Sequence, residues 1–574
     1  MLKDRLPTNI AARTAPNLFD VAVILCMLGL AVAVGAVARH TFGPLTAPDA
    51  VAIHLDPAWL PGYAMRTTLR MFAALMASLL FTFTYAVWAA KSRRAGVILV
   101  PILDILQSIP ILGFLTFTVV FFMSLFPGRV LGAELAAIFT IFTSQAWNMA
   151  FSMYQSLKTI PGDLEEATRS FGLSSWQRFW RLEVPFAMPG LVWNTMMSMS
   201  GGWFMVVASE TITVGSTNVV LPGIGSYVGA AIQQRDIRAV LYAIFTMLVV
   251  ILLYDQLLFR PLVAWSARFR FETTQGAVAQ DPWVLAMLRR TRLLSRASGL
   301  FGGFLTRIGG LPIGRRPGAP RRSALPPRVM DGIWIGVLAL AVALALWQLA
   351  LYISSSLSLR DVGHVLLLGC YTLTRVVTMI VLASLVWVPI GVWLGLRPVW
   401  ARRAQPVAQF MAAFPANLFF PIFVVVIVHY SLNSNVWLTP LMILGTQWYI
   451  LFNVIAGAAA FPADLLEVAD NFRLGGWRWW VRVMIPGIFP YYVTGALTAS
   501  GGAWNAAIVS EVASWGKTTL TAQGLGSYIA AATAAGSTAQ VALGMVAMSA
   551  FVITFNRMVW RPMYAFAQRR LTFA

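Results

Sequence analysis

The chain of 574 residues is 59% hydrophobic and only 11% charged, and its mean hydropathy is +0.73. So few polar residues cannot cover a soluble globule of this size, which places the chain in a lipid bilayer. The net charge of +21 could suggest nucleic acid as a partner, but the Lys and Arg residues gather in alternate loops, as the positive-inside rule predicts for a membrane protein without nucleic acid. Two cysteines and four scattered histidines fit neither a disulfide framework nor a metal site.

The first half of the chain contains six apolar segments long enough to cross a bilayer, which requires about 20 residues each. The first follows Lys3, Arg5 and Arg13 and lacks a cleavage-site pattern, so we expect a retained span and a cytoplasmic N-terminus. Lys91-Ser-Arg-Arg94 marks the cytoplasmic side after the second span. The six predicted spans cover residues 19–38, 65–90, 98–126, 130–157, 186–209 and 240–259.

Residues 262–328 carry twelve arginines against only Glu272 and Asp281, with clustered Gly and Pro from position 299 onward. This composition predicts a basic cytoplasmic linker. Within residues 282–296 the apolar residues and arginines could separate into two faces of a helix that lies on anionic lipid. A solvated basic connector explains the same charges equally well.

The second half repeats the first, with predicted spans at residues 330–352, 365–396, 405–430, 436–460, 487–510 and 541–559. Matching residues confirm the repeat: Thr67 and Arg70 correspond to Thr372 and Arg375, and Ser200-Gly-Gly202 corresponds to Ser500-Gly-Gly502. Because each half has six spans and begins inside, the two copies are parallel, related by an axis along the membrane normal. We therefore expect an all-α polytopic membrane protein with about twelve spans, made of residues 1–261, the linker 262–328 and residues 329–574.

One charged stretch, residues 161–185, returns 301 positions later as residues 462–486, and each copy is bounded by prolines. Asp163-x-x-Glu166 has the form of a capping box that opens a short helix, and Asp464-x-x-Glu467 repeats it. Gly172 can end the first helix, and Ser174-x-x-Gln177 can cap the next one. Each copy therefore predicts a helix-turn-helix that projects into the cytoplasm, where an amphipathic helix can lie in a groove of a soluble partner.

The first copy resembles a loop of known transporters. Glu166-Ala-Thr-Arg-Ser-Phe-Gly172, nine residues and Leu182-Glu-Val-Pro185 resemble the Glu-Ala-Ala-x3-Gly-x9-Ile-x-Leu-Pro loop of binding-protein-dependent ABC importer permeases. The second copy has Arg473 in place of the loop glycine, so we expect two similar docking helices with unequal turns. The resemblance implies that the loop couples the permease to an ATPase through Asp163, Glu166, Ala167, Gly172, Asp464, Glu467, Ala469, Arg473 and Gly475.

Motifs elsewhere in the chain resemble one branch of these permeases in particular. Phe414-Pro-Ala-Asn417 and Leu520-Thr-Ala-Gln-Gly-Leu-Gly526 are similar to the nitrate, sulfonate, taurine and bicarbonate branch, which implies uptake of a small, usually anionic solute by alternating access across a bacterial inner membrane. The implied partners are two copies of an ABC ATPase on the cytoplasmic side and a periplasmic or lipid-anchored solute-binding protein. On this interpretation the chain is not an enzyme and holds no cofactor, and ATP and Mg belong to the ATPase.

Polar and aromatic residues within the spans are candidates for the translocation path: Gln145, Trp147, Asn148, Asn194, Gln447, Trp448 and Asn505. Such residues also commonly hydrogen-bond neighbouring helices. Candidates for an external gate lie near the ends of the fifth and eleventh spans, namely Glu210, Gly223, Tyr227, Glu511, Gly524 and Tyr528, although the glycines can serve close packing alone. We expect very few ionisable residues inside the spans, with Asp104 as one of them.

Other functions fit the sequence less well. A secondary transporter of the major-facilitator type would share the span count and the central loop, but Lys91-Ser-Arg-Arg-Ala-Gly96 lacks the Asp of the Gly-x3-Asp-Arg signature of that class. Gly516-Lys-Thr518 fails as a phosphate-binding loop because position 511 is Glu rather than Gly. A lipid-modifying enzyme would require an acidic or His cluster at one interface, and the sequence suggests none.

Overall fold

A computed structural model of the chain describes residues 28–29, 35, 53–108, 111–214, 217–269, 302–304, 306–313 and 327–570. All but three residues of the predicted first span lie outside this set, as does the candidate lipid-surface helix at residues 282–296. The side chain of Asp104 is also outside the described part.

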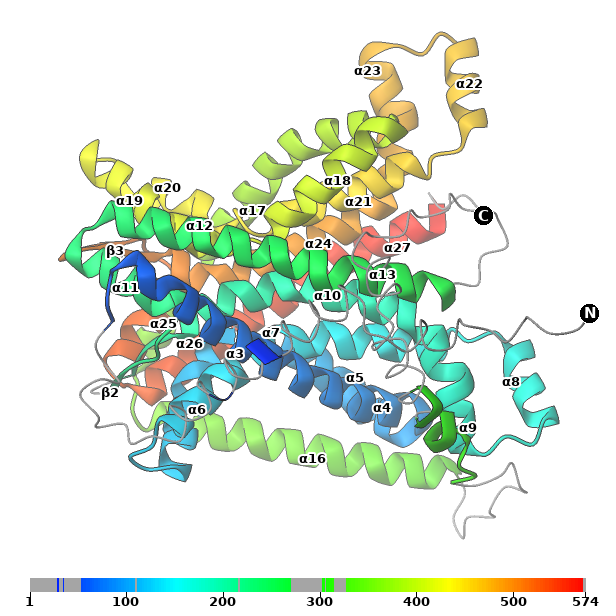
Figure 1. Cartoon of the computed structure of the whole chain (residues 1–574), viewed down its shortest axis with the longest axis horizontal. Coiled ribbons are helices and arrows are strands. Elements are labelled where there is room, and N and C mark those ends of the chain that lie inside the picture. Colours follow the sequence, from blue (N-terminus) through cyan, green and yellow to red (C-terminus); the bar gives the residue numbers. More distant parts are fainter. Residues whose placement is uncertain are drawn as a thin grey trace, which may run out of the picture. The chain divides into compact units, whose positions relative to one another are not determined.

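Helices occupy the second to sixth predicted spans (Figure 1). The spans correspond to α3 (Leu60–Phe81) with α4 (Val87–Lys91), α5 (Arg93–Ser108) with α6 (Ile111–Leu125), α7 (Val130–Lys158), α10 (Val184–Ser209), and α12 (Ile237–Tyr254) with α13 (Arg260–Ser266).

All six predicted spans of the second half also contain helices. They are α16 (Pro327–Ser354), α17 (Leu359–Gly395), α18 (Pro398–Ala413) with α19 (Phe420–His429), α21 (Trp448–Ala459), α24 (Ile485–Ser510), and α26 (Thr538–Phe555) with α27 (Arg561–Arg570). The direction changes by 76° between α18 and α19. Phe414 leaves the helical conformation there (ψ 132°) because the ring of Pro415 disfavours a helical residue before it.

By length and composition, six helices of the described part can cross a membrane, or eight if each sharply bent pair counts as one span. The structure also repeats details that hydropathy does not predict. Single π-helical turns occur at matched places, at η4 (Phe179–Glu183) and η9 (Trp480–Met484), and at η5 (Asp255–Phe259) and η10 (Asn556–Trp560). The helical fold with two repeats is therefore confirmed.

Each half also contains a short antiparallel β-hairpin that we did not predict. The hairpins are β1 (Thr211–Val214) with β2 (Thr217–Val220), and β3 (Val512–Trp515) with β4 (Thr518–Thr521). Trp515 pairs with Thr518, which leaves Gly516 and Lys517 as a two-residue turn. Gly516 has a φ of +61°, a conformation that favours glycine at the first central position of such a turn. The Gly516-Lys-Thr518 motif is thus a hairpin turn.

The chain forms two compact units, which we describe separately: residues 1–42, 152–196 and 252–324, and residues 43–151, 197–251 and 325–574. The core of the larger unit includes Val376 of α17, Ile450 of α21 and Val493 of α24, all completely buried. Small residues allow these helices to approach closely. A Cβ on Gly495 would lie 2.7 Å from the carbonyl oxygen of Tyr449, too close for any side chain. Small residues at such close contacts are typical of helix interfaces in membranes.

Candidate functional site

The charged stretches form two short helical hairpins. They are α8 (Gly162–Ser170) with α9 (Ser175–Arg178), and α22 (Ala463–Asn471) with α23 (Gly476–Trp479). The predicted capping boxes at Asp163 and Asp464 are wrong, because the helices begin after Pro161 and Pro462 and both aspartates lie inside the first turn. Their negative charges still stabilise the helices there, because they lie near the positive end of the helix dipole. The predicted Ser174–Gln177 capping box is present.

The turns that end α8 and α22 have the same backbone geometry. Gly172 has a φ of +62°, and Arg473 adopts nearly the same left-handed conformation with a φ of +48°. Equivalent hydrogen bonds close both turns, from Leu173 N to Thr168 O (3.1 Å) and from Leu474 N to Ala469 O (2.9 Å). The expectation of unequal turns is therefore wrong. A non-glycine residue in this conformation costs about 1–2 kcal/mol, which the hydrogen bonds of the turn offset in the second copy.

Both hairpins expose a carboxylate and an aromatic ring at matched positions. Glu166 and Glu467 are exposed. Phe171 and Phe472, at the ends of the two helices, are 81% and 75% exposed. Exposed aromatic side chains are suited to anchor a protein interface because they bury a large apolar area in a partner's pocket. Among the other implied coupling residues, Ala167 and Gly475 are exposed, whereas Ala469 is buried.

The two hairpins are held by different interactions. In the first, the guanidinium of Arg178 lies 2.6 Å from the carboxylate of Glu165 and 3.0 Å from that of Glu183. The equivalent positions in the second copy, 301 residues later, are Leu466, Trp479 and Met484, which pack in the apolar core cluster. An ionic tie in the first copy thus corresponds to a hydrophobic contact in the second.

Part of the linker packs on the first hairpin. The indole nitrogen of Trp176 donates to the carbonyl of Ile308 at 2.7 Å, and the amide of Gln177 donates to the carbonyl of Gly310 at 2.7 Å. We call residues 306–313 the linker segment. The residue equivalent to Trp176 in the second hairpin is Trp477, which is 76% exposed. The linker segment therefore distinguishes the first hairpin from the second.

A buried charge network in the first half connects α3, α7, α10 and the start of α11 (Ile224–Gln234). The guanidinium of Arg70, 4% exposed, contacts both carboxylate oxygens of Glu134 at 2.6 and 2.7 Å. It also lies 2.8 Å from the carboxylate of Glu210. Glu210 accepts hydrogen bonds from the hydroxyl of Thr67 (2.6 Å) and from the backbone amide of Gly225 (2.6 Å). The last contact ties the end of α10 to the first turn of α11.

The second half has an equivalent network with one fewer carboxylate. Arg375 lies 3.0 Å from Glu511, and the hydroxyl of Thr372 donates to Glu511 at 2.8 Å. Glu511 accepts from the amide of Ser527 at 3.0 Å, in the first turn of α25 (Leu525–Ala534). The position of Glu134 is occupied by Asn435, whose amide oxygen accepts from Arg375 at 3.2 Å. One arginine thus faces two carboxylates in the first half and one in the second.

The glycines of the gate candidates allow each glutamate to reach the helix start. A Cβ on Gly223 would lie 2.2 Å from the Cδ of Glu210, and one on Gly524 would lie 2.3 Å from an oxygen of Glu511. Any side chain at Gly223 or Gly524 would therefore occupy the space of the glutamate carboxylate. Tyr227 is fully buried, and its hydroxyl donates to the carbonyl of Leu55 at 2.8 Å. The structure brings Glu210, Gly223 and Tyr227 together as a packed junction, and their gating role stays a prediction, as does that of Glu511, Gly524 and Tyr528.

The path candidates have local partners on their own or neighbouring helices. Gln145 is fully buried between the sulfur atoms of Met71 and Met199. The contacts of the amide candidates are Asn148 to Ser198 (2.9 Å), Asn194 to Ser152 (2.9 Å), Gln447 to Trp387 (2.9 Å) and Asn505 to the carbonyl of Gly501 (3.1 Å). Trp448 contacts Trp387, and Trp147 is almost completely buried. These contacts stabilise the bundle, and a role in translocation stays a prediction.

Sequence reasoning missed Arg70, Glu134 and Arg375 as site residues. The expectation of few ionisable residues in the spans considered Asp104 but not these three, which lie within the second, fourth and eighth predicted spans. The signal was available, since a charge in an apolar segment requires a buried partner of opposite sign, and the arginine recurs in both copies.

Comparison with known proteins identifies the family. The sequence profile of the family described as "Binding-protein-dependent transport system inner membrane component" matches residues 82–259 and again residues 387–570. The chain belongs to this family. Each match contains one of the two helical hairpins, so the chain is a fusion of two domains of an ABC importer permease. The exact domain boundaries at residues 261 and 329 stay predictions.

Several curated permeases are similar to parts of the chain. The glycine betaine/proline betaine transport system permease protein ProW of Escherichia coli is 30% identical over 184 residues, which are 32% of this chain and 49% of ProW. The bicarbonate transport system permease protein CmpB of Synechocystis sp. is 30% identical over 132 residues, 23% of this chain and 45% of CmpB. The nitrate import permease protein NrtB of Leptolyngbya laminosa is 23% identical over 188 residues, 33% and 64% of the two chains. The chain thus spans about half the length of the curated relatives it matches.

The charge network leads to a prediction about stability. Arg70→Ala leaves Glu210 buried without its cation and removes the bidentate partner of Glu134, which should cost about 3–5 kcal/mol. Glu134→Gln removes one carboxylate but keeps the buried Arg70–Glu210 pair, so we expect a clearly smaller loss. The measurement is the thermal unfolding midpoint of the purified chain in detergent. An equal or larger effect of Glu134→Gln would contradict this account of the network.

The linker contact leads to a second prediction. Trp176→Ala removes the ring and the hydrogen bond that hold the linker segment, so amide hydrogen exchange in residues 306–313 should become at least about tenfold faster. Trp477→Ala is the matched control and should leave the exchange of the linker segment unchanged. If exchange there is the same in the wild type and the Trp176→Ala variant, the contact does not order the segment.

Proposed function

We propose that the chain is the transmembrane permease of an ATP-driven importer that takes up a small anionic solute by alternating access. The observation that carries the proposal is the pair of helical hairpins, each within one family match and each exposing a glutamate and a phenylalanine just before the same backbone turn. In this proposal each hairpin docks on one of two ATPase subunits at the cytoplasmic face of the inner membrane. A separate binding protein delivers the solute from the other side.

The geometry of the hairpins suits the transmission of a displacement. The closed turns and the ties behind them, ionic in the first copy and apolar in the second, fix each docking helix to the span that follows it. A movement of the ATPase subunits then moves α10 and α24. The buried charge networks fasten α10 to α3 and α24 to α17, so each group of helices moves as one body.

In this proposal the solute path runs between the two halves of the chain, where they contact each other within the larger unit. The break between α18 and α19 lies against α10, where the side-chain amide of Asn417 donates to the carbonyl of Phe204 at 3.0 Å. Ser200 of α10 also donates to the carbonyl of Ala412. The amide oxygen of Asn417 is buried without a hydrogen-bond partner in the described part. Transporters commonly place solute sites at such interrupted helices because the ends of the broken helices present free polar groups.

The proposal also specifies the charge of the solute. The names of the relatives include bicarbonate, nitrate and glycine betaine, and the motifs around Asn417 and Gly526 favour the anionic members of this range. Uptake of bicarbonate, nitrate, a short alkyl sulfonate and glycine betaine into proteoliposomes can distinguish them. We expect uptake of one of the anions. A preference for glycine betaine would contradict the proposal that the solute is an anion.

Loss of the exposed side chains should uncouple the permease. In the double variant Glu166→Ala with Glu467→Ala, and in Phe171→Ala with Phe472→Ala, we expect solute-stimulated ATP hydrolysis by the reconstituted complex to fall at least about tenfold, because the docking anchors are gone. Phe245→Ala, at a residue that is 66% exposed on α12, is the control and should have no effect. Normal stimulation in both double variants would contradict the docking role of the hairpins.

The energy source can be tested separately. Uptake by the chain with its ATPase subunits and binding protein should require ATP and should not respond to a proton gradient alone. Accumulation by the purified chain with a proton gradient and no ATP would instead support a secondary transporter.

A further inference from the structure

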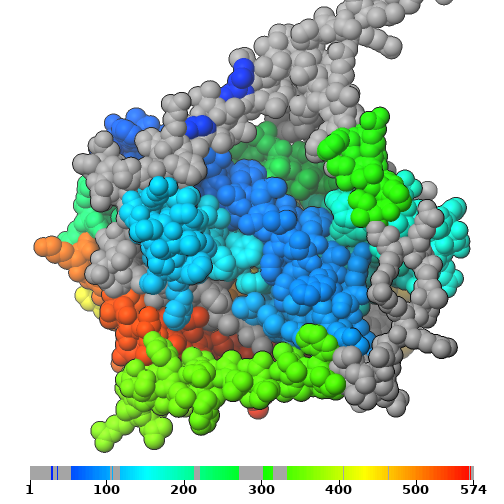
Figure 2. Space-filling view, turned by 90° about the horizontal axis from the view of Figure 1, so that it is seen from below, coloured from blue at the N-terminus to red at the C-terminus, as the bar shows by residue number. Residues whose placement is uncertain are grey.

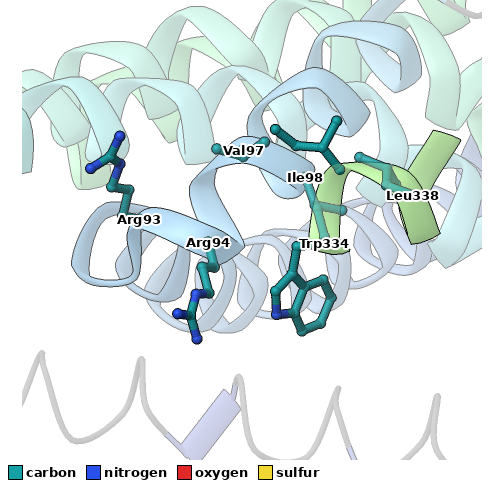
Figure 3. Close-up of a pocket in the computed structure, with 7 residues that line it drawn as sticks. Arg93, Arg94, Val97, Ile98, Trp334 and Leu338 are labelled. Carbon is teal, nitrogen blue, oxygen red and sulfur yellow. The ribbon is translucent and has the colours of Figure 1, made fainter. Parts of the chain in front are cut away.

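We propose that a pocket between α5 and α16 binds the headgroup of an anionic phospholipid. Seven residues line it: Arg93, Arg94, Val97, Ile98, Trp334, Ile335 and Leu338 (Figure 3). The first four belong to the first half of the chain and the others to the second half, and all lie in the larger unit. A lipid bound here would contact both halves. This inference does not depend on the proposed transport function.

The lining of the pocket changes from charged to apolar along the helices, as a phospholipid changes from its headgroup to its acyl chains. Arg93 and Arg94 form the first turn of α5, and the apolar Val97 and Ile98 follow one turn later. Trp334 lies near the start of α16, and Leu338 follows one turn later. In Figure 3 the side chains of Arg94 and Trp334 extend to the same side, while Ile98 and Leu338 lie near each other. The arginines can hold a phosphate, the indole suits the glycerol ester region, and the aliphatic side chains suit an acyl chain.

The charge of the pocket favours a headgroup with a net negative charge. Both arginines are exposed, and none of the seven lining residues is acidic. Lys91, also exposed, precedes them by two residues and adds a further positive charge. Basic pockets between spanning helices on the cytoplasmic side are a known setting for anionic headgroups. Free phosphate would satisfy the arginines but would leave the apolar part of the pocket without a ligand.

The surroundings of the pocket provide room for acyl chains. Figure 2 shows α16 along the surface of the molecule, beside α5. The most apolar 18-residue window of α16 has none of its residues buried inside the protein, and Trp334 and Ile335 are 45% and 55% exposed. Since the chain belongs to an inner-membrane family, lipid tails cover this face. The headgroup site is therefore continuous with a surface that already contacts lipid.

Binding can be measured by native mass spectrometry of the full chain in detergent, titrated with phosphatidylglycerol or phosphatidylcholine. We expect phosphatidylglycerol to bind at least about tenfold more tightly than phosphatidylcholine. Arg93→Gln with Arg94→Gln should remove this preference, and Trp334→Leu should weaken binding of phosphatidylglycerol severalfold. Lysine at both arginine positions should retain part of the preference.

A matched control separates a site from general electrostatic attraction. Arg238→Gln with Arg360→Gln removes the same charge at two exposed residues elsewhere and should leave the preference intact. The proposal is overturned if this control loses the preference as fully as the pocket variant, or if the pocket variant keeps it. Competition by soluble glycerol 3-phosphate at the same concentration as the lipid would also overturn it, in favour of a free phosphate site.

Discussion

The buried contact between an arginine and a glutamate is the constraint on which each half of this permease depends. Removing Arg70 and Glu210, or Arg375 and Glu511, from water carries a penalty of several kcal/mol per ion unless each ion has well-placed partners. The hydroxyls of Thr67 and Thr372 provide one further partner in each network, and a helix-start amide provides another. Because a displaced helix would leave a charge unpaired, the networks fix the relative position of the helices they join.

Glycine and glutamate act as a pair in this arrangement. The carboxylates of Glu210 and Glu511 reach the amides of α11 and α25 only because Gly223 and Gly524 have no Cβ to block them. The networks nevertheless differ, since Asn435 replaces Glu134. In the first half Arg66, about one turn before Arg70, also interacts with Glu134, whereas the equivalent position in the second half is Tyr371. The comparison indicates that one Arg and one Glu suffice to hold the junction in the second half, and that the first half adds both a carboxylate, Glu134, and a second arginine, Arg66.

Much of the fold could be predicted from the sequence because duplication provides an internal comparison. The matched prolines and glutamates located both helical hairpins at the correct residues. Predictions that depended on one local rule were less successful. Arg473 occupies the left-handed conformation expected of glycine because the hydrogen bonds of the turn require it, and Asp163 lies two positions after the residue that caps its helix. The short β-hairpins were hidden by the long apolar segments around them, and the partners of Arg70 lie 64 and 140 residues away, beyond any local pattern.

The linker segment has a physical reason to pack on the first hairpin rather than the second. The Arg178–Glu165 pair is about 30% exposed, and an ion pair of this kind contributes only about 0–1 kcal/mol and is weakened by salt. In the second copy Met484 is fully buried, and burial of such a side chain contributes about 1.5–3 kcal/mol that salt does not screen. The contact between the two helices of the first hairpin therefore depends on partly exposed charges, although the other partner of Arg178, Glu183 before the following span, is buried. Hydrogen bonds from Trp176 and Gln177 to the linker segment, with the packing of the indole, stabilise this hairpin further. Two hairpins with the same backbone turn are thus stabilised in different ways, and the fused chain contributes to the first through the connection between its halves.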